Sequence, residues 1–139
     1  MRWRRVAGGY VAVFERGDEV VDGLRRLARE AGIRSGFFVG LGAVDRVQLA
    51  FWDLERKEYL RTDLEGDHEV GNLTGNLTRL NGEPFVHAHG VVAGRDFLAR
   101  AGHIMSARVS ATLEVHVHDF GAEITRGMVP DIGLNLCKL

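Results

Sequence analysis

The residues best suited to chemistry lie in a short stretch where two histidines alternate with apolar residues. The stretch runs Glu83-Pro84-Phe85-Val86-His87-Ala88-His89-Gly90. Successive side chains of a β-strand point to opposite faces, so His87 and His89 would project on one side with their Cα atoms roughly 7 Å apart. At that separation both imidazoles can converge on one metal ion.

His103 is the candidate for a third ligand. It follows a turn-like segment, residues 93–96, that would bring the chain back beside the first strand, and Gly102 leaves room for close approach. Three neutral His nitrogens at about 2.0–2.1 Å with one open position form the ligand set of a reactive zinc site, whereas structural zinc usually has four protein ligands rich in cysteine. The spacing makes His87, His89 and His103 candidate ligands of one divalent cation such as zinc.

Alternating histidines also have a simpler interpretation, as polar residues on the wet face of a strand. His116 and His118 have the same spacing, within a run from Arg108 to His118 in which polar and apolar residues alternate. That alternation is typical of a half-buried strand with one polar face, so solvated histidines explain this second pair. The same interpretation stays open for His87 and His89.

Length and composition predict one soluble globular domain spanning residues 1–139. Apolar residues make up 45% and charged residues 27% of the chain, and the net charge of -1 gives no general attraction to nucleic acid or anionic membrane. The single Cys137 excludes an internal disulfide and a cysteine-based zinc cluster, and it fits a reducing compartment. The sequence indicates no role for this thiol.

The N-terminal segment carries positive charge, as a signal peptide would. Its apolar stretch, Tyr10 to Phe14, is too short for the hydrophobic part of a signal peptide, and no run approaches the length of a membrane span. We therefore expect a cytoplasmic protein with no membrane partner.

One helix is predicted after Gly17. Asp18 would cap its start, an apolar stripe at helical spacing follows, and Gly32 suits its end. The opposite face carries three arginines, for which phosphate contact and simple solvation are both open, solvation being the commoner case: Arg25, Arg26 and Arg29.

The remaining segments read as strands. Asn81-Gly82 is the strongest hairpin signal, and it places 69–78 antiparallel to the strand of His87. Gly40-Leu41-Gly42 is a weak phosphate-loop signal, because another strand follows where a nucleotide-binding unit needs a helix. The expected fold is α+β, a mostly antiparallel sheet of about seven strands with one main helix packed on it. Strand-like segments, not all of which need form separate strands, lie at 10–14, 36–43, 47–52, 59–62, 69–78, around His87, 108–118, 123–126 and 133–136.

With these segments placed, the chain resembles the plants-and-prokaryotes conserved (PPC) domain, formerly a domain of unknown function. The resemblance rests on the order and spacing of short pieces along most of the chain: Gly17-Asp18, Gly40-Leu41-Gly42-Ala43, the hairpin through Tyr59, Leu73-Thr74-Gly75-Asn76, Pro84 to His89, Gly102-His103, Thr112-Leu113-Glu114-Val115 and Gly133-Leu134-Asn135-Leu136. It implies a stand-alone prokaryotic type, a homotrimer, and a fold similar to that of acetolactate decarboxylase, in which a His-x-His pair and a later His hold zinc.

The resemblance maps the metal ligands onto His87, His89 and His103. It also draws attention to polar residues that would face the same pocket, with ordinary surface or interface polarity as the alternative: Glu69, Glu114 and Arg126. Where the family often has Gly-Gly-His, this chain has Ala101 before Gly102, which would alter the approach of that segment. The Arg-Gly-Arg core of the AT-hook, which binds DNA in plant members, is missing, so we expect weak or indirect DNA binding at most.

Two functions of different classes follow. The first is a self-associating, metal-binding module that recruits protein or nucleic-acid partners. The second is a small zinc-dependent enzyme acting on a carbonyl-bearing or carboxylate-bearing small molecule, with a glutamate as proton carrier and Arg126 as the anion-binding group.

Overall fold

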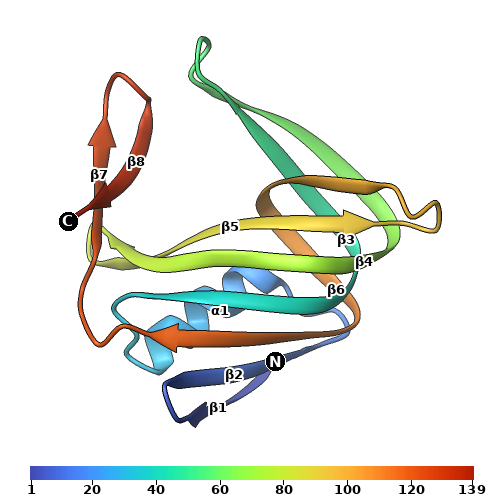
Figure 1. Ribbon diagram of the computed structural model, residues 1–139, viewed down its shortest axis with the longest axis horizontal. Helices are drawn as coiled ribbons and strands as arrows, with labels where there is room; N and C mark the ends of the chain where they lie inside the picture. Colours follow the sequence, from blue (N-terminus) through green and yellow to red (C-terminus); the bar gives the residue numbers. More distant parts are fainter.

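The computed structural model describes residues 1–139 as one large, bent β-sheet with a single helix against it (Figure 1). The fold class matches the expectation of a mostly antiparallel sheet with one main helix. The elements in chain order are β1 (Arg2–Val6), β2 (Gly9–Glu15), α1 (Val20–Glu30), β3 (Gly36–Asp53), β4 (Glu58–Leu80), β5 (Glu83–Ala93), β6 (Ala99–Asp119), β7 (Thr125–Val129) and β8 (Leu134–Lys138).

The sheet closes on itself in its middle. Its main path runs β1-β2-β6-β3-β4-β7-β8, and β5 pairs with both β4 and β6. The circuit β3-β4-β5-β6 is therefore closed where residues 89–93 of β5 pair with β6, whereas residues 83–88 of β5 pair with β4 alone. All of these pairings are antiparallel except a single parallel bridge, Arg79 to Thr125, between β4 and β7.

The long strands merge segments that the sequence predicts as separate. Expected strands at 36–43 and 47–52 form one 18-residue strand, β3, and the segments 59–62 and 69–78 both lie in the 23-residue β4. Two register shifts bend β3, between Gly40 and Gly42 and between Val44 and Arg46. A Cβ on Gly42 would lie 2.2 Å from the Thr112 carbonyl oxygen of β6, so this glycine permits close strand packing and does not form a phosphate loop.

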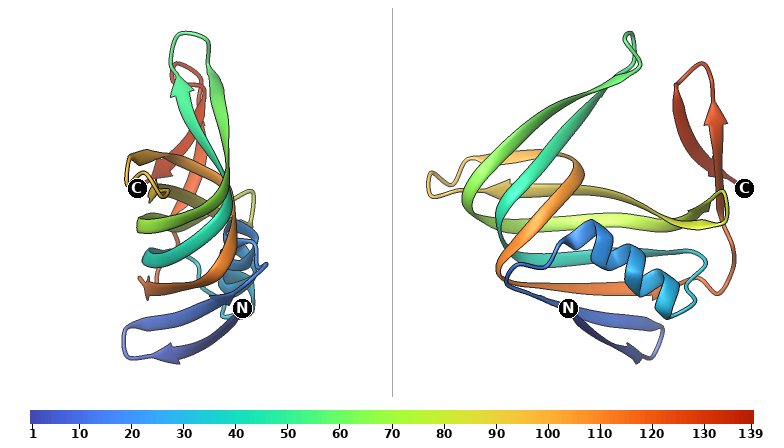
Figure 2. Two further views of the ribbon diagram at one scale, coloured as in Figure 1. Left: turned by 90° about the vertical axis from the view of Figure 1, so that its right-hand side faces the viewer. Right: turned by 180° about the vertical axis from the view of Figure 1, so that it is seen from behind.

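Helix α1 covers one face of the sheet, as the right-hand view of Figure 2 shows. Its apolar stripe is buried in the core cluster between helix and sheet, and Gly32 at φ +69° ends the helix as expected. The buried helical residues are Val20, Val21, Gly23, Leu24, Leu27 and Ala28. The structure contains no helix with the length and apolar character needed to cross a membrane.

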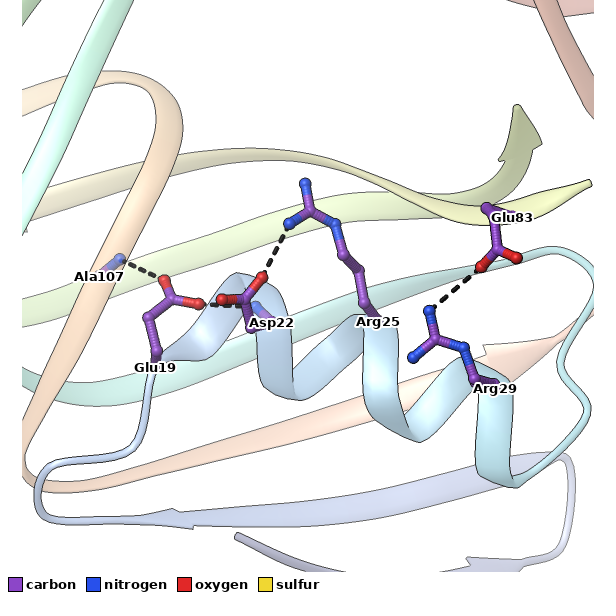
Figure 3. Close-up of polar contacts among 6 residues, drawn as sticks. All are labelled: Glu19, Asp22, Arg25, Arg29, Glu83 and Ala107. Atoms are coloured by element: carbon purple, nitrogen blue, oxygen red, sulfur yellow. Dashed lines mark hydrogen bonds and ion pairs between the residues drawn. The ribbon is translucent and has the colours of Figure 1, made fainter. Parts of the chain in front are cut away.

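The N-cap of α1 is Glu19, which corrects the expectation that Asp18 caps the helix. One Glu19 carboxylate oxygen accepts from the Asp22 backbone N–H at 2.6 Å and the other from the Ala107 N–H of β6 at 2.9 Å (Figure 3). Asp18 instead accepts from the Glu15 N–H and pairs with the N-terminal amine. The longer Glu19 side chain can reach both helix and sheet, so one carboxylate anchors α1 on β6.

Two of the helix arginines have carboxylate partners. Arg25 pairs with Asp22 at 2.8 Å, and Arg29 reaches across to Glu83 of β5 at 3.1 Å (Figure 3). This pairing favours the solvated interpretation of the arginine face over phosphate contact.

Two hairpins, β3–β4 and β7–β8, project from the body of the sheet (Figures 1 and 2). Their turns are joined by hydrogen bonds. The Trp52 indole N–H donates to the Ile132 carbonyl at 3.1 Å, and the Lys57 ammonium donates to the Pro130 carbonyl at 2.7 Å. These contacts hold the outer end of the β7–β8 hairpin, whose base meets β4 through the Arg79–Thr125 bridge and through side-chain hydrogen bonds of Arg126.

Candidate metal centre

A tight turn sets the register of the strand that carries the first two histidines. Asn81 and Gly82 both have positive φ, +52° and +84°, as the two-residue turn predicted from their sequence requires. The resulting ladder places His87 opposite Asn76 and His89 opposite Thr74. The residues between and beside the histidines face the core, so both imidazoles lie on the other face of β5.

His103 joins the pair by direct cross-strand pairing. It lies on β6 opposite His89 and also opposite Ala50 of β3. A Cβ on the preceding Gly102 would lie 2.9 Å from the Ala50 carbonyl oxygen, so glycine permits the approach of β3 at this point. Ala101 is exposed, and the replacement of the family's first glycine causes no crowding there.

The three imidazoles form one compact cluster. Ring centroids are 5.1 Å apart for His87 and His89, 5.2 Å for His87 and His103, and 5.4 Å for His89 and His103. One nitrogen from each ring lies within 4.8 Å of the other two. Tetrahedral zinc with bonds of about 2.0–2.1 Å needs nitrogens roughly 3.3 Å apart, so small side-chain rotations suffice. The residues present therefore fit a three-histidine metal site.

Burial favours the neutral, metal-binding form of two of these rings. Removal from water lowers the pKa of His87 to about 4, with further contributions from the Arg126 guanidinium and from His89. Burial likewise lowers the pKa of His103 to about 4, assisted by the neighbouring His87 and His89. Metals bind neutral imidazole, so protons compete weakly at these two positions above pH 4.

These pKa values predict that the metal-free protein loses stability in mild acid. His87 and His103 bind protons near pH 6.5 in the unfolded chain and only near pH 4 in the folded chain, so the free energy of unfolding rises with pH between these values. The contribution is complete above about pH 6.5 and is lost as the pH falls to about 4. We expect at most on the order of 2 kcal/mol for each ring, after a discount for the water that still reaches them.

Urea unfolding of the chelator-treated protein at several pH values measures this slope. His103→Asn, which removes one titrating group, should flatten it, and His116→Asn serves as the exposed control. An unchanged slope in His103→Asn would show that burial does not perturb this imidazole.

Arg126 of β7 lies beside the cluster and is held by neutral partners. Its Nε donates to the Thr78 hydroxyl at 2.8 Å, one Nη to the Asn135 carbonyl at 2.8 Å, and the other Nη to the Asn76 side-chain oxygen at 2.7 Å. The guanidinium lies 4.8 Å from the ring centre of Phe85, and one Nη lies 3.5 Å from His87 Nδ1. No carboxylate lies within ion-pair distance of this guanidinium.

A cavity of about 310 Å³ opens next to His87 and His103. Pairing between β5 and β6 starts at Ala93–Ala99 and stops at His89–His103, and the cavity lies where the two strands separate. Its lining residues come from α1, β4, β5, β6 and the β7–β8 hairpin: Val21, Arg25, Tyr59, Phe85, Val86, His87, His103, Ile104, Met105, Arg126, Gly133, Leu134, Asn135 and Leu136.

The other polar residues singled out from the sequence lie elsewhere. Glu69 pairs with Ala43 and Ala93 in the sheet, and Glu114 pairs with Val13 and Leu41, so neither lines the cavity that Arg126 lines. His116 and His118 are exposed at the opposite end of β6 and belong to no ligand cluster. His118 packs its ring against Phe37 and Phe120. Cys137 is exposed on β8, opposite Arg126.

Sequence reasoning missed three residues that shape the site. Asn76 and Thr78 orient Arg126, and Tyr59 packs its ring 5.3 Å from that of His103. The Asn81-Gly82 turn already contains the signal for the first two, because a two-residue hairpin pairs Asn76 with His87. Nothing local indicates Tyr59, which the bend of β4 brings to the cluster.

The fold and the site define a small α+β protein with a candidate three-histidine metal centre. The family sequence model of the Plants and Prokaryotes Conserved (PCC, or PPC) domain matches residues 3–121. The chain belongs to this family. Arg126 and the β7–β8 hairpin follow the matched residues.

Solved structures resemble this chain over nearly its whole length. A protein of Bacteroides thetaiotaomicron described as a candidate DNA-binding protein has 31% identity and a TM-score of 0.95, covering 99% of this chain and 96% of its own. A metal-containing protein of Archaeoglobus fulgidus has 27% identity and a TM-score of 0.87, covering 94% and 93%.

More distant structures share the fold alone. Acetolactate decarboxylase of Bacillus subtilis has 12% identity and a TM-score of 0.60, covering 88% of this chain and 57% of its own. The fold similarity to acetolactate decarboxylase that the sequence predicts is therefore confirmed. A comparison with curated proteins finds no match.

Proposed function

We propose that this protein is a metal-binding PPC domain in which His87, His89 and His103 hold one zinc ion. The observation that carries the proposal is the convergence of three imidazole nitrogens within 4.8 Å, from two strands in direct register. Support comes from the relative described as metal-containing. Three protein ligands leave one tetrahedral position open toward an exogenous ligand.

Zinc titration of chelator-treated protein tests the proposal. We expect one zinc per chain and a higher unfolding temperature with zinc, because a ligand that binds only the folded state stabilises it. Zinc binding that persists when all three histidines are replaced would contradict the assignment.

We further propose that the chain self-associates as a homotrimer, as the family resemblance implies. Support comes from an apolar strip on the outer face of β3, where Phe37, Val39 and Leu41 are 45%, 42% and 62% exposed. These residues alternate with Phe38 and Gly40 along the strand, so they share one face of the sheet. Contiguous exposed apolar surface is typical of an interface.

Light scattering should report a mass three times the 15.4 kDa of one chain at micromolar concentration. Val39→Glu should shift the population toward monomer, because a charge would be buried in the interface. Phe97→Glu, on the loop between β5 and β6 where Phe97 is 88% exposed, is the control. A stable monomeric wild-type protein would contradict the trimer.

A second candidate function is zinc-dependent catalysis on a small molecule. The observation that favours it is the cavity that His87 and His103 line. Zinc there would polarise a carbonyl or lower the pKa of bound water to about 7. A crystal structure of the zinc-loaded protein separates the two functions, since a water or small anion as fourth ligand favours catalysis and a protein ligand excludes it.

We propose that this chain binds DNA weakly at most. The net charge is -1, and ion pairs with Asp22 and Glu83 engage Arg25 and Arg29 of the helix face. Non-specific DNA affinity comes mainly from phosphate contacts by concentrated positive charge. Retention of duplex DNA at physiological salt would contradict this.

A further inference from the structure

We propose that the cavity beside the histidine cluster binds a small monocarboxylate, with its acid group between the metal and Arg126 and its apolar body inside the cavity. The inference rests on the proposed metal site and adds the class of ligand. It follows from the charge balance of the site, from the donors that Arg126 has left, and from the size and chemistry of the cavity walls.

The charge balance requires an anion. The three ligands are neutral imidazoles, so a divalent cation bound to them keeps its full charge. The Arg126 guanidinium, 3.5 Å from His87, adds a further positive charge and has no carboxylate partner. No Asp or Glu lines the cavity. Like charges repel strongly in a partly buried site, so an anion between the metal and Arg126 stabilises both.

The donors of Arg126 favour a carboxylate over a phosphate. A guanidinium has five N–H groups, and Arg126 uses three of them in bonds of 2.7–2.8 Å to Thr78, Asn135 and Asn76. A fourth is directed to His87 at the long distance of 3.5 Å. The one remaining N–H suits one carboxylate oxygen, whereas a phosphate group has three charged oxygens to satisfy.

The cavity walls favour an apolar body for the ligand. Most of the remaining lining is hydrophobic, including Val21, Ile104 and Leu134. A volume of about 310 Å³ corresponds to on the order of ten water molecules, and thus to a ligand of about ten non-hydrogen atoms. Arg25, the other cation of the lining, pairs with Asp22 at 2.8 Å, so a second acid group would find no unpaired cation.

Benzoate, a monocarboxylate of suitable size, is the probe, and benzamide is its neutral isostere. Calorimetric titration of the zinc-loaded wild-type protein should show benzoate binding at least about tenfold tighter than benzamide, because a charge-assisted hydrogen bond is lost in the amide. Inorganic phosphate should bind more weakly than benzoate. Cobalt-substituted protein gives a second readout, since an anion that enters the coordination sphere changes its visible absorption spectrum.

Arg126→Gln should weaken benzoate ten- to hundredfold and leave zinc affinity equal or higher, because a nearby cation is removed. Arg25→Gln is the matched control from the same cavity and should change benzoate affinity less than about twofold. Arg126→Lys keeps the charge and tests whether any loss in Arg126→Gln comes from misfolding. Circular dichroism of each variant checks the fold.

The outcomes separate this inference from the proposed function. If zinc binds but benzoate is not preferred over benzamide, the carboxylate site is wrong and the metal centre is still supported. The same conclusion follows if Arg25→Gln lowers benzoate affinity as much as Arg126→Gln does. Absence of zinc binding overturns the metal centre. In that case an Arg126-dependent preference of the metal-free protein for benzoate supports the anion site alone, and its absence overturns both.

Discussion

Replacement of His103 by alanine is expected to lower zinc affinity by more than about hundredfold. Loss of an outer-shell partner of a metal ligand typically costs 10- to 100-fold, and loss of one of only three protein ligands should cost more. The two remaining imidazoles of His87 and His89 would still lie on one face of β5, but the cross-strand side of the cluster would be missing. His87→Ala and His89→Ala should have effects of similar size.

Zinc content after dialysis and competition with a chromophoric chelator measure these affinities. The matched control is His116→Ala, which removes an exposed imidazole from the same strand, β6, outside the cluster. It should leave zinc affinity unchanged. Full occupancy in His103→Ala, or equal loss in His116→Ala, would mean that other histidines hold the metal.

Gly75→Ala is expected to destabilise the fold and the metal centre together. Gly75 lies in β4 between β3 and β5, and a Cβ there would lie 2.1 Å from the His87 carbonyl oxygen, 2.5 Å from the Phe38 ring and 3.0 Å from the Ala88 Cα. Two of these contacts are with the backbone of β5, so that strand would have to move. We expect a loss of about 3 kcal/mol, which for a chain of this size lowers the unfolding temperature by roughly 10 °C.

Gly71→Ala is the matched control, from the same strand. The nearest atom to a Cβ at Gly71 is the Val91 carbonyl oxygen at 3.9 Å, an ordinary contact. This variant should be neutral or slightly more stable, because alanine restricts the unfolded chain. Thermal unfolding of both variants and zinc titration of Gly75→Ala give the comparison. Equal stability of the two alanine variants would show that β4 and β5 separate at Gly75 without cost.

The sequence was informative wherever a local rule fixes geometry. The i, i+2 spacing of His87 and His89 places both on one face of a strand, whatever that strand packs against. The Asn81-Gly82 turn fixes the register of β4 and β5, because a two-residue hairpin leaves one pairing scheme. The helix was predictable from its apolar period. Its N-cap, Glu19 in place of Asp18, was not, because the bond from Ala107 that also holds the Glu19 carboxylate comes from a residue distant in sequence.

The sequence could not show how far strands continue. Gly40 and Gly42 indicated a break after the first half of β3, yet the strand continues through a register shift into its second half. The same glycines that interrupt a local pattern allow β6 to pack closely. Bulges bend a strand without ending it, and only the partner strand reveals which has happened.

The sequence alone therefore determined the family, the fold class and the shared face of His87 and His89, and it named His103 and Arg126 as candidates. Tertiary structure decided how these two meet the histidine pair. His103 pairs with His89 because the β3-β4-β5-β6 circuit closes, and Arg126 reaches His87 because the β7–β8 hairpin is held by Trp52 and Lys57. Glu69 and Glu114 were equally plausible site residues by type, but the strand register places both of them away from the cavity. Turn chemistry fixes neighbours a few residues apart, whereas contacts across the sheet depend on bends that no local pattern encodes.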